Sequence, residues 1–131
     1  MTDRALVERW LVDYVAAWKS YDRDEIGALF AEDAEVRYHP WDEPITGRDA
    51  IVESWFGAGE GAPGKDEQGT YEGSYTPVAI DGDLAVVTGT STYAKEPGGP
   101  VDQTFHNCFL IRFDAEGRCS EFAEWYMEPR E

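Results

Sequence analysis

The sequence has little cysteine and histidine, the residues from which disulfide frameworks and many metal sites are built. Its 131 residues include two of each: Cys108, Cys119, His39 and His106. Four side chains on separate segments do not make a tetrahedral set of ligands, so we expect no metal. The two cysteines are predicted to lie about 13 Å apart in one hairpin, beyond disulfide reach. Free thiols indicate a reducing compartment, and we expect a cytoplasmic protein.

Positive charge is also scarce, because 11 Lys and Arg stand against 27 Asp and Glu, a formal net charge of −16. The basic residues are scattered singly, so the sequence offers no patch that could hold phosphates. We therefore expect neither nucleic acid nor an anionic membrane as a partner. Long apolar runs are missing as well, and the first 25 residues lack the pattern of a signal peptide, so we expect no membrane segment and no leader.

A glycine-rich stretch from Gly59 to Lys65 matches the spacing of a phosphate-binding loop but lacks what such a loop needs. The next residue is Asp66, where the loop requires serine or threonine to hold the metal. Acidic neighbours on both sides would repel phosphate. We therefore expect no nucleotide and no other cofactor, and we predict a mobile loop over residues 57–69.

Hydrophobic side chains are abundant: they make up 42% of the chain, with 6 Phe, 5 Trp and 7 Tyr among them. This composition differs from that of disordered acidic proteins, and one folded domain over residues 1–131 is expected. Apolar positions spaced near 3.6 residues predict a long helix over residues 3–21. Asp22 followed by Glu25 predicts the start of a second, short helix, and Thr46 to Asp49 predicts the start of a third.

A period of two replaces the helical period in the second half of the chain. Before it, the segment from Ala34 to His39 alternates as a single strand among the helices. Helices followed by an antiparallel meander are typical of the α+β class. The turn signal Asp81-Gly82 is the strongest of the meander, whose four strands are predicted over residues 71–80, 84–95, 101–113 and 118–127.

The last hairpin places one polar pair on a face that is otherwise aromatic. If residues 114–117 form its turn, Asn107 lies opposite Glu124, between the pairs Phe109 with Phe122 and Phe105 with Tyr126. The apolar face should lie under the helices, which turns Glu124 inward. A desolvated Glu124 bonded to Asn107 would have a raised pKa and serve as a general acid or base. The alternative is an ionised, solvated Glu124 at the open end of a cavity.

The other face of this hairpin carries His106 opposite Trp125, which puts the imidazole outside. A β-bulge between Thr104 and Asn107 would shift the alternation by one residue and turn His106 inward, so His106 stays a second catalytic candidate. His39 follows the inward Tyr38 and is predicted to point outward, with a structural role, unless Pro40 twists the chain and turns it back.

Several aromatic residues carry a polar tip or stand where an open end is expected. An apolar cavity with phenol and indole donors suits a flat, moderately polar ligand, such as a polyketide, steroid or phenolic compound. The alternative is that the same residues simply fill the core. The predicted pocket residues are Tyr14, Trp18, Tyr38, Trp41, Trp55, Tyr75, Asn107, Phe109, Glu124 and Tyr126.

Three segments, Leu29 to Val36, Gly47 to Ile51 and Phe113 to Arg118, resemble the NTF2-like superfamily, which includes the SnoaL-like and ketosteroid-isomerase-like proteins. The resemblance covers essentially the whole chain in the order of its elements. It implies a cystatin-like cone, in which a curved antiparallel sheet wraps around one long and two shorter helices. It also implies an apolar pocket at the open end and a homodimer packed through the outer sheet faces.

The same resemblance bears on activity. Ketosteroid isomerases have an aspartate base where this chain has Tyr38, and tyrosine, with an ordinary pKa of about 10, cannot replace that base near neutral pH. The polyketide cyclases use a pocket carboxylate as base, and Glu124 is the candidate for that role. The segment Ser20 to Asp22, Tyr38 and the strand of His106 are similar to scytalone dehydratases, in which paired tyrosines hold a water and histidines handle protons.

Three functions stay open on these grounds. The first is a cofactor-independent isomerase, cyclase, dehydratase or hydrolase that uses Glu124 or His106 together with Tyr38. The second is a non-catalytic carrier or sensor of a small apolar or aromatic ligand. The third is a protein-interaction module of the transport-factor type, in which the cone is filled and the exposed sheet face binds a partner.

Overall fold

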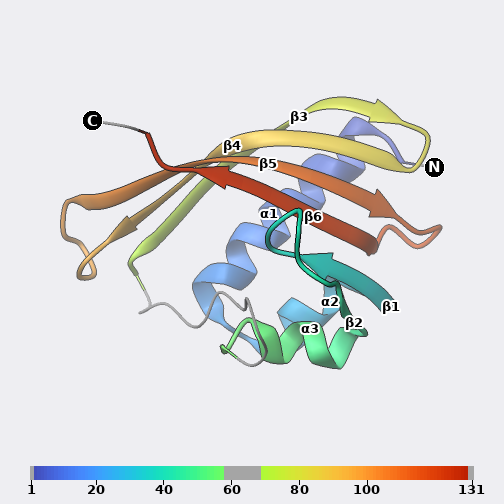
Figure 1. Cartoon of the computed structure of the whole chain (residues 1–131), viewed down its shortest axis with the longest axis horizontal. Helices are drawn as coiled ribbons and strands as arrows, with labels where there is room; N and C mark the ends of the chain where they lie inside the picture. Colours follow the sequence, from blue (N-terminus) through green and yellow to red (C-terminus); the bar gives the residue numbers. More distant parts are fainter. Residues whose placement is uncertain (1, 58–68, 130–131) are drawn as a thin grey trace.

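Three helices lie on one side of a curved six-stranded sheet (Figure 1). The structure is a computed structural model that describes residues 2–57 and 69–129, so nearly all of the predicted loop 57–69 lies outside the described residues. The helices are α1 (Arg4–Ser20), α2 (Arg23–Ala28) and α3 (Arg48–Ser54). The strands are β1 (Phe30–Arg37), β2 (Ile45–Thr46), β3 (Tyr71–Asp81), β4 (Leu84–Ala94), β5 (Val101–Phe113) and β6 (Cys119–Met127).

The long helix α1 forms where the periodicity predicts it. Asp3 caps its start and accepts a hydrogen bond from the backbone N–H of Leu6 at 2.9 Å. Tyr21 ends it in the left-handed conformation, at φ 51°, and donates its backbone N–H to the carbonyl of Ala17 at 2.9 Å. The apolar stripe of the sequence is the buried face of the helix, formed by Val7, Trp10, Leu11, Tyr14, Ala17 and Trp18.

The two short helices also confirm their predicted positions. The carboxylate of Asp22 caps α2 by accepting from the backbone N–H groups of Asp24, at 2.9 Å, and Glu25, at 3.1 Å. The side chain of Glu25 accepts from the hydroxyl of Ser20 at 2.6 Å. Helix α3 starts after Gly47, which has a φ of 97° and provides no side-chain cap. None of the helices in the described ranges is long and apolar enough to cross a membrane.

The sheet contains the predicted antiparallel meander, extended at one edge by a parallel strand. The strand order is β2-β1-β6-β5-β4-β3, and β1 runs parallel to β6, which makes the sheet mixed. β1 begins at Phe30, earlier than the predicted Ala34. Its pairing with β6 shifts register between Phe30 and Glu35. Such an irregularity interrupts the period of two, and this is why the alternation reveals only the second half of the strand.

The predicted pairing of the last hairpin is wrong by two residues. In the structure Asn107 lies opposite Tyr126 and Phe109 opposite Glu124. The hairpin turn includes Arg118, whose backbone carbonyl accepts from the N–H of Asp114 at 2.9 Å, and a bulge follows at the next pair of β5. Because the shift is an even number of residues, every side chain keeps its predicted face.

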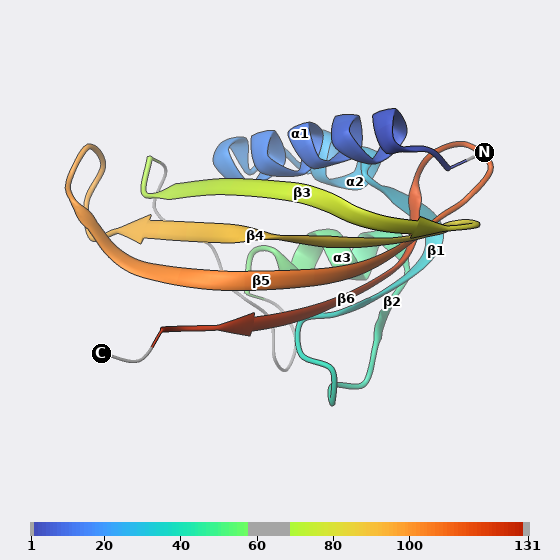
Figure 2. The same cartoon turned by 90° about the horizontal axis from the view of Figure 1, so that it is seen from above.

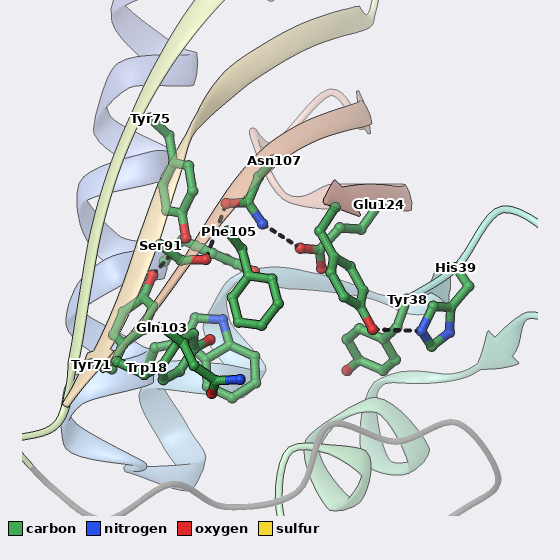
Figure 3. A pocket seen from close by; sticks show the side chains of 13 residues that line it. Trp18, Tyr38, His39, Tyr71, Tyr75, Ser91, Gln103, Phe105, Asn107 and Glu124 are labelled. Atoms are coloured by element: carbon green, nitrogen blue, oxygen red, sulfur yellow. Dashed lines mark hydrogen bonds between the residues drawn. The ribbon is translucent and has the colours of Figure 1, made fainter. Parts of the chain in front are cut away.

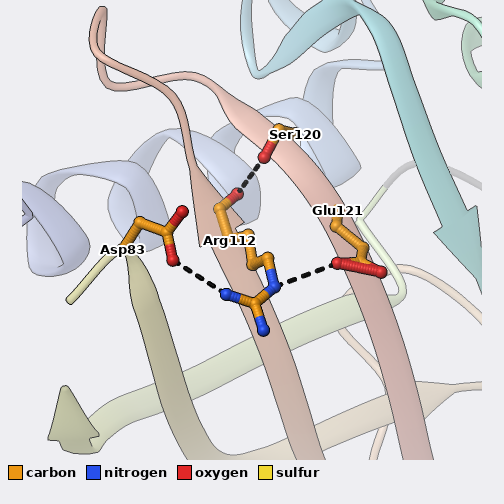
Figure 4. A network of polar contacts seen from close by, with 4 residues as sticks. All are labelled: Asp83, Arg112, Ser120 and Glu121. Carbon is orange, nitrogen blue, oxygen red and sulfur yellow. Dashed lines mark hydrogen bonds and ion pairs between the residues drawn. The ribbon is translucent and has the colours of Figure 1, made fainter. Parts of the chain in front are cut away.

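On the outer face, Arg112 ties three segments together at this end of the sheet, as Figure 4 shows. Its guanidinium contacts Asp83, in the β3–β4 turn, at 2.8 Å and Glu121 of β6 at 3.1 Å. Its backbone carbonyl accepts from the hydroxyl of Ser120 at 3.3 Å. Each of these exposed ion pairs contributes little to the free energy of unfolding. Together they join β5 to the β3–β4 turn and to β6.

We call the end of the sheet at the β5–β6 turn the closed end, and the opposite end the open end. At the closed end the inner face is packed solid: the indole of Trp10 stacks on Tyr14 at 5.2 Å and meets Phe113 edge-on at 5.8 Å. The N–H of Trp10 is satisfied by the carbonyl of Leu29 at 2.9 Å. Figure 2 shows that the long strands curve between this packed end and the β4–β5 hairpin. The cavity described next lies at the open end.

The two cysteines are free, as predicted. Cys119 is fully buried at the start of β6, and Cys108 is half-buried in β5. Burial raises the pKa of the Cys119 thiol.

Candidate functional site

The open end of the cone contains a cavity of about 460 Å³. Its walls come from α1, from all four strands of the meander and from the two residues that follow β1 (Figure 3). A space of this size fits a small organic molecule. The cavity is lined by Tyr14, Trp18, Tyr38, His39, Tyr71, Tyr75, Ser91, Tyr93, Gln103, Phe105, Asn107, Glu124 and Tyr126.

A chain of hydrogen bonds crosses three strands on the cavity wall and ends at a carboxylate. The hydroxyl of Ser91, in β4, donates to the amide oxygen of Asn107, in β5, at 3.0 Å. The amide nitrogen of Asn107 donates to a carboxylate oxygen of Glu124, in β6, at 2.8 Å. Ser91 and Asn107 are both buried, so these hydrogen bonds satisfy polar groups that water does not reach. The contact runs diagonally, because Glu124 is paired directly with Phe109.

Burial raises the pKa of Glu124 from 4.5 to about 7, and the hydrogen bond from Asn107 opposes part of this shift. The carboxyl group is half-buried, and no lysine or arginine is among the described residues that line the cavity. A carboxylate without a cationic partner in an aromatic wall favours its neutral form. At neutral pH the protonated and ionised forms of Glu124 are therefore both populated.

The tyrosines around Glu124 keep their protons. Burial raises the pKa of Tyr38, Tyr71 and Tyr75, and the negative charge of Glu124 adds to the effect in each case. The hydroxyls of Tyr71 and Tyr75 bond to each other at 2.8 Å, and that of Tyr38 bonds to Ser54 at 2.7 Å. These phenols are hydrogen-bonding groups of the wall and cannot act as bases near neutral pH.

His39 lies at the mouth of the cavity and not outside it, which corrects the sequence prediction. Its Nδ1 lies 2.8 Å from a carboxylate oxygen of Asp42, and its Nε2 lies 2.7 Å from the hydroxyl of Tyr126. The chain turns after β1, where the backbone N–H of Asp42 donates to the carbonyl of His39 at 3.1 Å. This turn ends the alternation that predicted an outward imidazole. The spacing of Asp42 three residues after His39 is the signal that could have revealed the pair.

Seven of the ten predicted pocket residues line the cavity, and three do not. Trp41 is 79% exposed and stacks on the outer side of His39 at 5.0 Å. Trp55 is buried behind Trp18, with the two rings stacked at 3.8 Å. Phe109 is buried beside Tyr75, with ring centroids 4.9 Å apart. The structure brings together Tyr14, Trp18, Tyr38, Tyr75, Asn107, Glu124 and Tyr126.

His106, the second catalytic candidate, is exposed on the outer face of β5. The pairing of β4 with β5 runs without interruption from Gln103 to Arg112, and its irregularity lies just before Gln103, opposite Tyr93 and Ala94 of β4. Because no bulge falls between Thr104 and Asn107, Asn107 keeps the inward place. His106 therefore does not reach the cavity.

Five further lining residues escaped the prediction besides His39. Tyr71, Ser91, Tyr93 and Gln103 occupy strand ends or polar positions at which burial cannot be inferred from the alternation of apolar residues. Phe105 is on the predicted inner face, but the alternation does not show whether that face borders a cavity or the core. The signal that could have revealed them is the alternation along each strand. All five are at inward-facing positions of β3, β4 and β5, near the open end. In the described part of the chain, no group of three or more His, Cys, Asp and Glu is placed to hold a metal.

Comparisons with known proteins agree with this architecture. The model of the SnoaL-like domain family matches residues 11–122. The structure is similar to an NTF2-like protein of unknown function from Burkholderia xenovorans LB400, with a TM-score of 0.68, 17% identity, and coverage of 97% of this chain and 87% of that one. It is similar to a candidate ketosteroid isomerase from Kribbella flavida DSM 17836, with a TM-score of 0.69, 21% identity, and coverage of 100% and 84%.

A third solved structure is a protein of unknown function with a cystatin-like fold from Methylobium petroleophilum PM1, with a TM-score of 0.64, 20% identity, and coverage of 98% and 80%. The search of curated proteins found no match. At these identities the solved structures show the fold alone, while the family model spans most of the sequence. The chain therefore belongs to the SnoaL-like domain family, and its fold is similar to that of NTF2-like and cystatin-like proteins.

Proposed function

We propose that this protein is a cofactor-independent acid–base enzyme that acts on a small neutral molecule, with Glu124 as the group that removes and returns a proton. The observation that carries the proposal is the position of Glu124: its carboxyl group is half-buried in an aromatic wall and bonded to Asn107 at 2.8 Å. A general base works best when its pKa lies near the working pH, and the pKa of Glu124 is about 7.

The substrate class follows from the lining of the cavity. Aromatic rings make up most of the wall, and the polar groups among them are mainly phenols, an amide and a hydroxyl. Such a wall favours a flat, moderately polar compound of the polyketide, steroid or phenolic kind. Anionic substrates are disfavoured, because Glu124 has no cationic partner and the chain carries a net charge of −16.

The candidate ketosteroid isomerase among the similar structures names one reaction of this general type. For this chain we propose a different base, because Tyr38 stands at the position of the isomerase aspartate and its hydroxyl is bonded to Ser54 at 2.7 Å. In our proposal Tyr38 shapes the floor of the cavity and Glu124 of β6 transfers the proton. The reaction is then an isomerisation, cyclisation, elimination or hydrolysis that begins with proton removal.

A generic probe of proton abstraction tests this proposal without knowledge of the natural substrate. 5-Nitrobenzisoxazole is flat, neutral and aromatic, and removal of its C3 proton breaks its N–O bond to give a coloured phenoxide. We expect turnover to rise with pH through about 7, following ionisation of Glu124. The variant Glu124→Gln should lose about a hundredfold in kcat/KM, the lower range of what a positioned base contributes.

The matched control is Glu121→Gln, which changes a glutamate of the same strand on the outer face, where it pairs with Arg112. This variant should keep the full rate. Equal rates for the wild type and Glu124→Gln would contradict the proposal. Binding of the probe without turnover would then favour the carrier or sensor, and absence of binding would favour the interaction module.

We also propose that two chains pair as a homodimer through the outer face of the sheet. Supporting features are the half-buried Leu110 and Ala123 and the indole of Trp125, 40% exposed, which lie on that face of β5 and β6. Light scattering should give twice the 14.7 kDa of one chain, and Trp125→Glu should give the mass of one. A single-chain mass for the wild type at micromolar concentration would contradict the pairing. The cytoplasmic location stays a prediction.

A further inference from the structure

Besides Glu124, the cavity contains a second set of groups able to move a proton, and the mechanism above does not use it. This set is Asp42, His39 and Tyr126, joined in that order by contacts of 2.8 Å and 2.7 Å. Asp42 and His39 follow β1, whereas Tyr126 belongs to β6, so the fold brings together groups far apart in the sequence. Figure 3 shows His39 on the Glu124 side of the cavity, with a dashed line at its ring that marks the hydrogen bond to a tyrosine hydroxyl.

The contacts fix the roles of the two imidazole nitrogens. Asp42 can only accept, so Nδ1 of His39 carries a proton and donates to it. When His39 is neutral, Nε2 is an acceptor, and the hydroxyl of Tyr126 must donate to it. When His39 is protonated, Nε2–H donates to the phenol oxygen, and the phenol proton becomes free to turn into the cavity. The carboxylate of Asp42 holds the ring in the orientation that both states need, by accepting from Nδ1–H.

The phenol and the carboxylate face the same ligand space. Glu124 and Tyr126 are two residues apart on one strand, so they share a face and their Cα atoms lie about 7 Å apart. Both line the cavity. This separation suits a substrate that loses a proton at one atom and develops negative charge on another atom a few bonds away.

The set also opens toward solvent. The side chains of His39 and Asp42 are 25% and 22% exposed, and Tyr126 is 41% exposed. A proton that His39 gives up can therefore be replaced from water at the mouth, while Glu124 lies deeper in the wall beside the buried Asn107. Burial and the charges of Glu124 and Asp42 raise the pKa of Tyr126, so the phenol carries its proton before the reaction.

We propose that Tyr126 is the general acid of this site, that His39 and Asp42 are its positioning residues, and that the substrate is a neutral compound with a carbonyl or similar acceptor near an acidic C–H bond. This inference rests on the proposed role of Glu124 as the base. Together the two groups would make the site bifunctional, with base and acid on one strand.

The proton and electron movements balance without a further reactant. Glu124 takes the proton from carbon, the electron pair of that C–H bond forms a new carbon–carbon double bond, and the carbonyl π pair moves to oxygen. Tyr126 gives its phenolic proton to that oxygen and recovers one from Nε2 of His39. His39 is then protonated again from solvent. Glu124 then returns its proton to the same or another carbon, while the oxygen gives up its proton through Tyr126 and His39 to solvent. The carbonyl is restored, and one proton has entered from solvent and one has left, which completes a tautomerisation.

Two probes that differ in leaving-group basicity distinguish an acid from a wall residue. Benzisoxazole releases a more basic phenoxide than 5-nitrobenzisoxazole does, so a proton donated to that oxygen helps benzisoxazole more. We expect Tyr126→Phe to lose about tenfold in kcat on the nitro compound and about a hundredfold on benzisoxazole. An equal loss on both probes would overturn the proposal, because a change in packing or binding alone does not follow leaving-group basicity.

The same two probes test the positioning residues. His39 contacts the phenol of Tyr126 at 2.7 Å and would return a proton to it, so His39→Gln should lose more rate on benzisoxazole than on the nitro compound, as Tyr126→Phe does. His106→Gln is the matched control, since it removes the other histidine from the exposed outer face, and it should keep the wild-type rate on both probes. No loss in His39→Gln, or an equal loss on both probes, would overturn the relay.

The tyrosines that face the carboxylate of Glu124 stay protonated near neutral pH, because burial raises the pKa of each: they are Tyr14, Tyr38, Tyr71, Tyr75 and Tyr126. No lysine or arginine is among the described lining residues. The rise of the rate with pH through about 7 therefore belongs to Glu124. His39 and Asp42 are the other titratable groups, beside the phenol of Tyr126.

The failures of the two proposals look different. If Glu124→Gln keeps the wild-type rate on both probes, the proposed function itself is wrong. If Glu124→Gln loses its rate while Tyr126→Phe matches the wild type, the base stands and the acid is overturned. Tyr126 is partly exposed, so Tyr126→Phe should fold, and a urea unfolding curve for each variant verifies this before rates are compared.

Discussion

The closed and open ends of the cone are built from the same strands, yet one is a core and the other a cavity. Along the inner face of β5, Phe113, Ile111 and Phe109 are buried, whereas Phe105 is half-buried and Gln103 exposed. β6 repeats the change, from the buried Phe122 to the half-buried Glu124 and the exposed Tyr126. Rings occur at both ends. At the closed end they are mostly phenylalanine, and at the open end mostly tyrosine.

The difference between the two ends shows where a polar group on an aromatic face can contact a ligand: at the open end, where the face borders a cavity. At the closed end, the indole of Trp10 on α1 packs against rings of β1, β5 and β6, so the inner face is filled. At the open end the same alternation continues, but hydroxyl, amide and carboxyl groups replace the apolar side chains. Stability should therefore depend on the closed end, and chemistry on the open end. Each prediction below separates these two dependences.

The largest effect should come from emptying the closed end. Phe122 is 2% exposed and contacts the rings of Trp10, Tyr14 and Phe109. Phe122→Ala should lower the free energy of unfolding by about 3–5 kcal/mol, because it leaves a cavity among packed rings. Urea unfolding monitored by tryptophan fluorescence measures this. Phe105→Ala, at the open end, should cost clearly less, and equal losses for the two variants would show that both ends are core.

The next largest effect on the free energy of unfolding is an increase, in the variant Glu124→Gln. Burial raises the pKa of Glu124 from 4.5 to about 7, so the folded chain holds this proton more tightly than the unfolded chain. The free energy of unfolding then falls as pH rises between these values. Glu124→Gln removes this loss and should be more stable than the wild type by roughly 2–3 kcal/mol at pH 8, and about equal to it at pH 4. Unfolding curves at both pH values measure the difference, and a pH-independent difference would contradict the raised pKa.

A smaller loss should follow from cutting the hydrogen-bond chain. Asn107→Ala leaves the hydroxyl of Ser91 and the carboxyl of Glu124 without their partner, which should cost about 1–3 kcal/mol. Because the bond from Asn107 lowers the pKa of Glu124, its removal should raise that pKa further, as carboxyl 13C NMR would record. Ser91→Ala keeps the bond between Asn107 and Glu124, so it should leave the pKa of Glu124 nearly unchanged. A lower pKa in Asn107→Ala would reverse our account of the site.

The smallest effect should come from Tyr38→Phe, at the floor of the cavity. Without the phenol, the hydroxyl of Ser54 still donates to the carbonyl of Ile51 at 2.6 Å, so no donor is left unpaired. The free energy of unfolding should change by less than about 1 kcal/mol, and the pH profile with the benzisoxazole probe should keep its shape. A loss of rate as large as that of Glu124→Gln would instead make Tyr38 a proton-transferring group.

Local patterns predicted the elements of this fold well, and failed where a single residue breaks the period. The stripe of α1, the cap at Asp22 and the turn at Asp81-Gly82 each depend on neighbours in the sequence. The start of β1 was missed because its register shifts after Phe30. The pairing of β5 with β6 was two residues off because Arg118 joins the turn and a bulge follows it.

The candidate site divides in the same way. Glu124 and Asn107 were found because the inner face of a strand depends only on parity, which the register error did not change. His39 was missed because its orientation depends on the turn after β1 and on Tyr126, which comes from the other end of the chain. Trp41 and Trp55 are predicted in the pocket because each carries a polar tip or stands where an open end is expected. Whether a tryptophan lines a space, covers it or lies behind it depends on neighbours that the sequence does not place.

The sequence by itself determined the class of fold, the inward face of each strand and the carboxylate without a cationic partner, because helix and strand periods are local properties of the chain. Only the tertiary structure decided that this carboxylate faces open space, that Asn107 reaches it diagonally, and that Asp42 and His39 meet Tyr126 at the same mouth. These facts depend on how far the sheet curves away from α1 and on the parallel pairing of β1 with β6, which joins the two ends of the sequence.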